Sequence, residues 1–372
     1  MIKTFKIIFI TIIIFLTLDF SLGNLLIDTF KKKNIYITTE QTAKQNSINE
    51  KKFRIKDKNF SHTFKKNFKG TSFYGNKKNL ICTNEHGFRK NCIKKNNSNN
   101  YDYFFIGDSF TEGVGLNYPE TFVGIFENKT EYNVANLGVS SYSPIIYYHK
   151  LKYFLDNGLK TKHVILYLDV SDVEDEIYRY ECNKSVCYKD IKTQTNNKEL
   201  NKIDYLKKSI KKNLKITFTL LKHTKNLLCI NKLTSICYDI YDENFPRYSW
   251  INDFREYTNT NGVFKKPFDQ NVFYLKKISN LLKVKNIEFS LAIYPWPGNI
   301  LYNNDLDDYQ NYWENFCKDK CVFFINHFQD FDALKDTKSN KQIIKENYFY
   351  GDVHFNETGN LFIANKLIKL IN

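Results

Sequence analysis

From residue 101 onward, short runs of nearly continuous apolar residues alternate with longer amphipathic stretches. Apolar runs of this kind are typical of strands that are buried on both faces, and their alternation with helices indicates a parallel sheet. The sequence therefore predicts an α/β fold, a three-layer α/β/α sandwich with a parallel sheet. Strands are expected at 101–108, 132–138, 162–169, 287–297 and 322–328, and helices at 122–129, 144–158, 272–286, 308–319 and 356–372.

Two regions lack this alternation. Residues 27–98 are polar and rich in Lys and Asn, which predicts an irregular N-terminal extension docked on a domain at 99–372. Residues from about 178 to 270 predict a mostly helical insertion that includes a basic amphipathic helix at 203–229. Such a helix is either a lid over a substrate cleft or a solvated helix with one buried face.

The first 26 residues have the layout of an export signal. Lys3 and Lys6 precede an apolar run from Ile7 to Leu18, and small residues follow at Ser21 and Gly23. Because apolar residues continue beyond Asp19, residues 1–26 are either a signal peptide or a membrane anchor. In both cases the rest of the chain is expected to be exported, to the periplasm or cell envelope.

The eight cysteines agree with export, because they form four sequence-local pairs in an even-numbered set. A zinc site would need four converging ligands at spacings such as C-x2-C, which these pairs lack. Disulfides are therefore the expected state, and no metal is expected. The candidate pairs are Cys82 with Cys92, Cys182 with Cys187, Cys229 with Cys237, and Cys317 with Cys321.

The net charge of +15 does not indicate a nucleic-acid partner. The lysines are scattered among Asp, Asn and Tyr, without a long basic block interleaved with aromatic residues. A weak attraction to anionic lipids or glycans is the more reasonable expectation.

Chemically useful residues follow three of the predicted strands, where open α/β sheets bind ligands. Ser109 follows the first strand in a Gly-Asp-Ser sequence, at a turn where its hydroxyl and its N–H would face the sheet edge. Gly138 follows the second strand and permits close approach of a substrate. The acidic segment 169–176 follows the third strand.

A serine nucleophile also needs a base and a group that orients the base. His354 and Asp352 lie just before the last predicted helix and could serve as this pair. Taken singly, Ser109 could be a helix N-cap, Asp352 a turn residue and His354 a surface or core residue. Their combination at strand ends favours catalysis.

These motifs together resemble the SGNH/GDSL hydrolase family. The similar stretches are "GDSFTEG", "NLGVSSYSP" and "GDVHFNETGN", preceded by "TNEHGFRK". The resemblance implies a flavodoxin-like sheet, a triad of Ser109, His354 and Asp352, and no cofactor. It also implies an oxyanion hole of Ser109, Gly138 and Ser171, where Ser171 stands in place of the family's Asn. Asp108 and Asp172, beside these motifs, are predicted to contact substrate.

The predicted function is an exported serine hydrolase or O-acyltransferase that acts on an ester-linked acyl group, such as acetyl on a carbohydrate. Tyr142, Tyr294 and Trp296 either stack on sugar faces or belong to the core. Because Ser171 replaces an oxyanion donor, an alternative is an inactive envelope protein that binds a glycan or a protein partner. A weaker hypothesis is cation binding by the acidic segment 169–176.

Overall fold

The computed structural model divides into two compact units, Met1–Gln45 with Thr193–Asp239, and Asn46–Lys192 with Ile240–Asn372. The residues that the structure describes are 2–32, 50–74, 77–93, 98–178, 180, 182–183, 186–187, 209–210, 212–230, 254–260, 264–302, 307–349 and 352–371.

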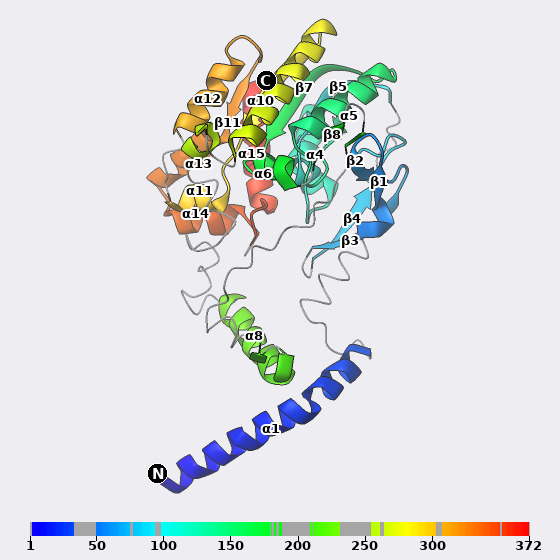
Figure 1. Ribbon diagram of the computed structural model, residues 1–372. Coiled ribbons are helices and arrows are strands. Elements are labelled where there is room, and N and C mark those ends of the chain that lie inside the picture. The colour runs from blue at the N-terminus through cyan, green and yellow to red at the C-terminus, as the bar shows by residue number, and fades with distance from the viewer. Residues whose placement is uncertain are drawn as a thin grey trace. The chain divides into compact units, whose positions relative to one another are not determined.

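The second unit contains a five-stranded, fully parallel sheet with the order β11-β10-β7-β5-β6 (Figure 1). When the five strands are numbered along the chain and read from β6 to β11, the order is 2-1-3-4-5. This is the doubly wound arrangement of flavodoxin-like folds. The predicted fold class is therefore confirmed. The strands are β5 (Asn100–Ile106), β6 (Val134–Asn136), β7 (Lys160–Leu168), β10 (Glu288–Ile293) and β11 (Phe324–Asn326).

Long helices cover both faces of this sheet. Right-handed crossovers put the helix after β5 on one face and the helices after β6, β7 and β10 on the other. Helix α4 accordingly packs against α15, whereas α10 packs against α5. The helices are α4 (Phe122–Thr130), α5 (Pro144–Asp156), α10 (Lys265–Val284), α12 (Asp307–Cys317) and α15 (Glu357–Ile371).

Shorter elements fill the connections between these helices and strands. They are α3 (Ser109–Glu112), η1 (Tyr118–Glu120), α6 (Asp172–Tyr178), β8 (Cys182–Asn183), β9 (Val186–Cys187), α9 (Arg255–Thr258), α11 (Pro297–Tyr302), α13 (His327–Asp332), η3 (Ala333–Asp336) and α14 (Asn340–Asn347).

The central strands form the core because their side chains are apolar on both faces. Phe104, Phe105 and Ile106 at the end of β5 are fully buried. Phe105 contacts Phe126 of α4 with ring centroids 5.2 Å apart. This packing fixes the carboxyl end of β5, from which the Gly-Asp-Ser turn begins.

The N-terminal extension is more regular than the sequence predicts. It forms two antiparallel hairpins, β1 (Arg54–Asp57) with β2 (Ser61–Phe64) and β3 (Lys69–Tyr74) with β4 (Lys77–Cys82). A disulfide joins Cys82 and Cys92 and closes the loop after β4. Short, polar strands of this length leave little alternation in a sequence, which is why the hairpins were not expected.

A second predicted disulfide, between Cys317 and Cys321, is also present, at the end of α12. Cys182 and Cys187 are Cα partners across β8 and β9, but their side chains are outside the described residues. The side chain of Cys229 and all of Cys237 are outside them too. These two pairings stay predictions.

The first unit contains α1 (Ile2–Lys32) and α8 (Lys215–Ile230), which pack against each other. Among the described residues, α1 is long and apolar enough to span a membrane, with a mean hydropathy of 2.2 over Lys3–Gly23. Helix α8 forms the second half of the basic helix expected at 203–229.

Candidate functional site

The turn after β5 presents Ser109 as the first residue of helix α3. Asp108 is the N-cap of this helix, and its Oδ1 accepts a hydrogen bond of 2.9 Å from Phe110 N. As the first helical residue, Ser109 has no intrahelical acceptor for its own N–H. The turn therefore offers both a hydroxyl and a backbone donor at the carboxyl edge of the sheet.

His354 and Asp352 lie next to this turn. The Nε2 atom of His354 is 2.8 Å from Ser109 Oγ, and its Nδ1 atom is 2.5 Å from Asp352 Oδ1. The backbone N–H of His354 also donates to Asp352 Oδ1 at 3.1 Å. The structure thus brings the three predicted catalytic side chains into one hydrogen-bonded row.

The charges in this row support each other. Burial works against the charged carboxylate, but the hydrogen bonds from His354 and Tyr74 outweigh it and lower the pKa of Asp352. Burial likewise works against a charged imidazole, yet the bond to Asp352 raises the pKa of His354 above its ordinary value. An imidazole with a raised pKa is a stronger base toward the Ser109 hydroxyl.

Tyr74, at the end of β3, is a member of the site that the sequence did not reveal. Its hydroxyl donates to Asp352 Oδ2 and lies 2.9 Å from His354 Nδ1. The ring packs edge-on against the imidazole at a centroid distance of 5.9 Å. The extension therefore contributes a side chain that holds the Asp352–His354 pair, from 278 positions away in sequence.

The sequence predicted that Asp108 contacts substrate, but this residue is only 3% exposed, so the contact is not supported. Its Oδ2 lies 2.9 Å from Ser109 Oγ, and burial together with the charge of Asp169 raises its pKa to about 7. The Ser109 hydroxyl donates to Asp108 Oδ2, and His354 Nε2 lies within hydrogen-bond distance of the same hydroxyl oxygen. Because a hydroxyl has a single hydrogen, Asp108 and His354 compete for it.

A buried ion pair supports helix α3 from the extension. Arg54 donates to both carboxylate oxygens of Glu112, at 2.8 and 3.0 Å. Glu112 Oε2 also accepts hydrogen bonds from the N–H and the hydroxyl of Ser140, at 2.6 and 2.7 Å. These bonds keep Glu112 charged despite its burial and tie the end of α3 to two other segments.

Arg89, from the "TNEHGFRK" stretch, supports the same helix at its C-terminal end. Its guanidinium donates to the carbonyls of Glu112 and Gly113 at 2.6 Å, and also to the carbonyl of Leu116. Carbonyls at a helix C-terminus lack intrahelical donors and favour a positive charge. The motif that precedes the domain thus supports the turn that carries Ser109.

Gly138 permits close packing rather than offering a free donor. A Cβ atom at this position would lie 2.7 Å from Glu112 N and 2.7 Å from Thr111 Cβ. Its N–H already donates to Asn136 Oδ1 at 2.9 Å, while Asn136 Nδ2 donates to Thr111 O. The predicted donation from Gly138 to an oxyanion would compete with the bond to Asn136.

Carboxylates of the acidic segment after β7 accept hydrogen bonds from other groups of the protein. Asp169 accepts from Trp296 Nε1 at 2.8 Å and from Ser171 N at 2.7 Å. Asp172 is fully buried and accepts from the hydroxyl of Tyr147 at 3.0 Å, and burial raises its pKa well above the ordinary value. Its predicted contact with substrate is not supported.

The three aromatic residues near the strand ends are core residues. Tyr142 and Tyr294 are 0% exposed and Trp296 is 4% exposed. Tyr142 donates to the carbonyl of His62, and Tyr294 packs on Phe110 at a centroid distance of 4.6 Å. Of the two alternatives for these residues, the structure supports a position in the core and does not support stacking on sugars.

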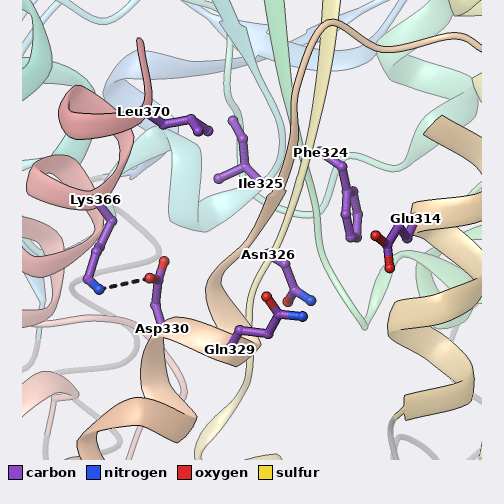
Figure 2. A pocket seen from close by; sticks show the side chains of 8 residues that line it. All are labelled: Glu314, Phe324, Ile325, Asn326, Gln329, Asp330, Lys366 and Leu370. Carbon is purple, nitrogen blue, oxygen red and sulfur yellow. Dashed lines mark ion pairs between the residues drawn. The ribbon is translucent and has the colours of Figure 1, made fainter. Parts of the chain in front are cut away.

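No group of three or more His, Cys, Asp or Glu side chains gathers as metal ligands among the described residues. A pocket of about 290 Å³ lies at the β11 edge of the sheet, away from the Ser109 turn, and Figure 2 shows the Lys366–Asp330 ion pair in its wall. Its lining residues are Glu314, Phe324, Ile325, Asn326, Gln329, Asp330, Lys366 and Leu370.

No family model and no curated protein matches this sequence. Three similar solved structures are a putative lipolytic protein of the G-D-S-L family from Desulfitobacterium hafniense, a member of the lipolytic G-D-S-L family from Veillonella parvula, and a mutant of an acetyl-xylooligosaccharide esterase from Geobacillus. Their identities are 12%, 11% and 12%, and their TM-scores are 0.37, 0.37 and 0.39.

The alignments span 73%, 72% and 73% of this chain and 99%, 97% and 94% of the respective structures. The first two carry the description of the family that the sequence motifs resemble. A likeness this distant does not bear on activity, for which the chain's own side chains are the evidence.

Proposed function

We propose that this chain is a serine hydrolase or O-acyltransferase of the SGNH type that acts on an ester-linked acyl group. The observation that carries the proposal is the row of hydrogen bonds from Asp352 through His354 to Ser109 Oγ. The row lies at the carboxyl edge of a parallel sheet, next to the switch point between β5 and β7, where such sheets bind ligands.

In the proposed acylation step, Ser109 Oγ attacks the acyl carbonyl carbon while its proton moves to His354 Nε2. Asp352 holds the imidazole in the tautomer that carries hydrogen on Nδ1 and stabilises the imidazolium. The tetrahedral intermediate then expels the alcohol oxygen, which receives the proton from Nε2. The Ser109 N–H is the backbone donor best placed to stabilise the oxyanion.

In the second step, an acceptor hydroxyl attacks the carbonyl carbon of the acyl-serine while His354 Nε2 takes its proton. The bond from this carbon to Ser109 Oγ then breaks, and Nε2 returns the proton to Ser109 Oγ. Water as acceptor gives hydrolysis, and a sugar hydroxyl gives transfer. Acetyl on a carbohydrate is the proposed substrate. The Asp352-x-His354 spacing departs from the D-x-x-H of many SGNH members and resembles the D-x-H of exopolysaccharide acetyltransferase relatives, in which it precedes the serine. The chemistry of this row needs no metal or cofactor.

Export is part of the proposal. The Cys82–Cys92 and Cys317–Cys321 disulfides are consistent with an oxidising compartment. The apolar helix α1 is consistent with passage through a membrane.

A second candidate, a binding protein without turnover, is favoured by one feature of the oxyanion region. Ser171 replaces the amide donor of the resembled family, and the Gly138 N–H is engaged by Asn136. Loss of one oxyanion donor costs on the order of 10²–10³ in rate.

Labelling with a fluorophosphonate probe distinguishes the two candidates. The full chain is compared with Ser109→Ala and His354→Ala, and with Ser98→Ala and His149→Ala as matched controls distant from the row. We expect labelling in the wild type and both controls and none in the two site variants, at equal circular dichroism. An unlabelled but folded wild type would favour the binding protein.

Acetyl-ester turnover with and without an oligosaccharide acceptor then separates hydrolysis from transfer.

A further inference from the structure

Helix α1 has the dimensions of a membrane span, but that alone does not decide its fate. The 21 residues of Lys3–Gly23 are about 31 Å long at 1.5 Å per residue, close to the thickness of a bilayer's hydrocarbon core. Only 6% of this segment is buried within the protein. A signal peptide that is removed after export would meet the same description.

Asp19 is the feature that separates the two fates. It is 1% exposed, although the apolar side chains around it, such as Leu18 and Phe20, are more than half exposed. Its Oδ1 accepts from Ile216 N at 2.9 Å, and its Oδ2 accepts from the N–H and hydroxyl of Thr217 at 2.7 and 2.6 Å. An acidic residue in an apolar helix is costly unless its oxygens are paired, and here both are.

The partner of Asp19 is the first turn of helix α8. Ile216 and Thr217 follow Lys215, where α8 begins, so their N–H groups have no intrahelical acceptors. A carboxylate at this end of a helix satisfies these donors and is attracted to the positive end of the helix dipole. Asp19 therefore caps α8 from a distant part of the chain, 197 positions away.

Gly23 shows that the contact is built into α1. It lies one turn after Asp19, and a Cβ atom there would be 2.2 Å from Asp19 Oδ1 and 3.7 Å from Ile216 Cγ1. A larger residue would displace the carboxylate from the α8 terminus. The small residue that resembles part of a signal-peptide cleavage site thus has a structural role in the α1–α8 contact.

We propose that α1 is retained as an anchor in a lipid bilayer, and that α8 docks on it where the span leaves the membrane. Cleavage at the predicted site would remove Asp19 and leave the first turn of α8 without its cap. Lys3 and Lys6 at the start of α1 place that end on the cytoplasmic side, so α8 lies at the outer surface.

Helix α8 has side chains suited to such a surface. Leu220 and Leu221 are 53% and 61% exposed, and Lys212 lies just before the helix. Exposed leucines with nearby lysines are typical of a helix at the boundary of a bilayer with anionic headgroups. The proposed partner of α8 is therefore an anionic lipid bilayer. This interaction surface does not depend on the proposed esterase function.

The fate of α1 is tested on the full chain expressed with export. Membranes are washed with alkaline carbonate, and the intact mass of the protein is measured in the pellet and in the wash. We expect the full-length mass in the pellet. A soluble chain that begins after Gly23 would overturn the proposal, whatever its esterase activity.

The α1–α8 contact is tested by trypsin digestion in phosphatidylcholine vesicles with and without phosphatidylglycerol. We expect the α8 segment of the wild type and of Asp19→Asn, which keeps an acceptor oxygen, to be protected more strongly with phosphatidylglycerol. Asp19→Leu should increase the cleavage rate at α8 at least tenfold while the protein stays in the membrane.

Thr17→Leu is the matched control, because Thr17 Oγ1 donates only to the helix's own Ile13 carbonyl. It should leave the protection of α8 unchanged. Equal cleavage of wild type and Asp19→Leu would show that α8 does not dock on α1. Protection that does not respond to phosphatidylglycerol would contradict the anionic surface.

Discussion

The turn that carries Ser109 and the loop that carries His354 are held in place by different means. The Ser109 turn is supported from several sides by buried groups, including the Arg54–Glu112 ion pair, the Arg89 guanidinium and the close approach of Gly138. The Asp352–His354 loop is partly exposed, with side-chain exposures of 28% and 16%.

The loop around His354 is held by a few polar bonds and by ring contacts. Phe349 N donates to the carbonyl of His354 at 2.9 Å, and Asp352 N donates to Phe349 O at 3.1 Å. Tyr74 of the extension donates to Asp352, and the His354 ring packs on Phe110 at a centroid distance of 4.9 Å. We infer that the position of Ser109 is tied to the stability of the domain, whereas the position of His354 can change while the domain stays folded. Three substitutions test this comparison.

Asp352→Asn should have the largest effect, and it should fall on activity. Without the carboxylate, His354 loses its orienting acceptor, and acylation should slow by on the order of 10⁴. The burial of His354 would remain while the raising effect of Asp352 disappears, so the pKa of His354 should fall relative to the wild type.

The reaction needs neutral His354, so the rate decreases as pH falls through the pKa of His354. In Asp352→Asn the midpoint of this decrease should move to lower pH, measured as kcat/KM against pH. The thermal unfolding midpoint should change little. A large loss of stability would contradict the independence of this loop from the domain.

Glu112→Gln should have the next largest effect, and it should fall on stability. The substitution leaves Arg54, whose side chain is 16% exposed, beside a neutral amide. Breaking a fully buried pair costs about 3–5 kcal/mol, and the loss here should lie at the low end of that range. The matched control is Glu120→Gln, since Glu120 pairs with Lys77 at 3.7 Å in a much more exposed position. An exposed pair contributes about 0–1 kcal/mol.

Urea unfolding of both variants measures the difference in the free energy of unfolding. Equal losses for Glu112→Gln and Glu120→Gln would show that the support of the Ser109 turn is no stronger than a surface ion pair.

The sheet was predictable because its strands are buried on both faces and leave continuous apolar runs. The segment 162–169, for example, predicted β7 (Lys160–Leu168), and parallel strands necessarily bring their carboxyl ends to one edge. The hairpins of the extension were not predictable, because their strands are only four to six residues long and mix polar with apolar residues, without a long apolar run.

The site could be predicted only in part, for a related reason. Ser109, Asp352 and His354 occur in recognisable short motifs, and the structure brings them together. Tyr74 lies in no motif, and its bond to Asp352 depends on how a polar hairpin docks, which neither spacing nor periodicity records. The hydroxyl of Tyr142 and its place near a strand end made a position at the substrate site as reasonable as one in the core, and the structure buries its ring in the core.

Tyr74→Phe should have the smallest of the three effects, and it tests whether the extension tunes the base. The phenyl ring preserves the packing on His354 and removes only the hydroxyl that donates to Asp352. A hydrogen bond to a charged group contributes about 1.5–3 kcal/mol. Water can replace part of this contribution in the variant, so kcat/KM should fall about tenfold.

The sign of the accompanying pH shift distinguishes tuning from packing. Without the Tyr74 hydroxyl, the negative charge of Asp352 is less dispersed and attracts the imidazolium more strongly, so the pKa of His354 should rise. The midpoint of the acidic decrease should therefore move to higher pH, opposite to its movement in Asp352→Asn. Tyr348→Phe is the matched control, since its hydroxyl donates to Pro295 O at 2.7 Å. A tenfold loss in Tyr74→Phe without a pH shift would mean that the extension only packs against the loop, and that Asp352 alone sets the basicity of His354.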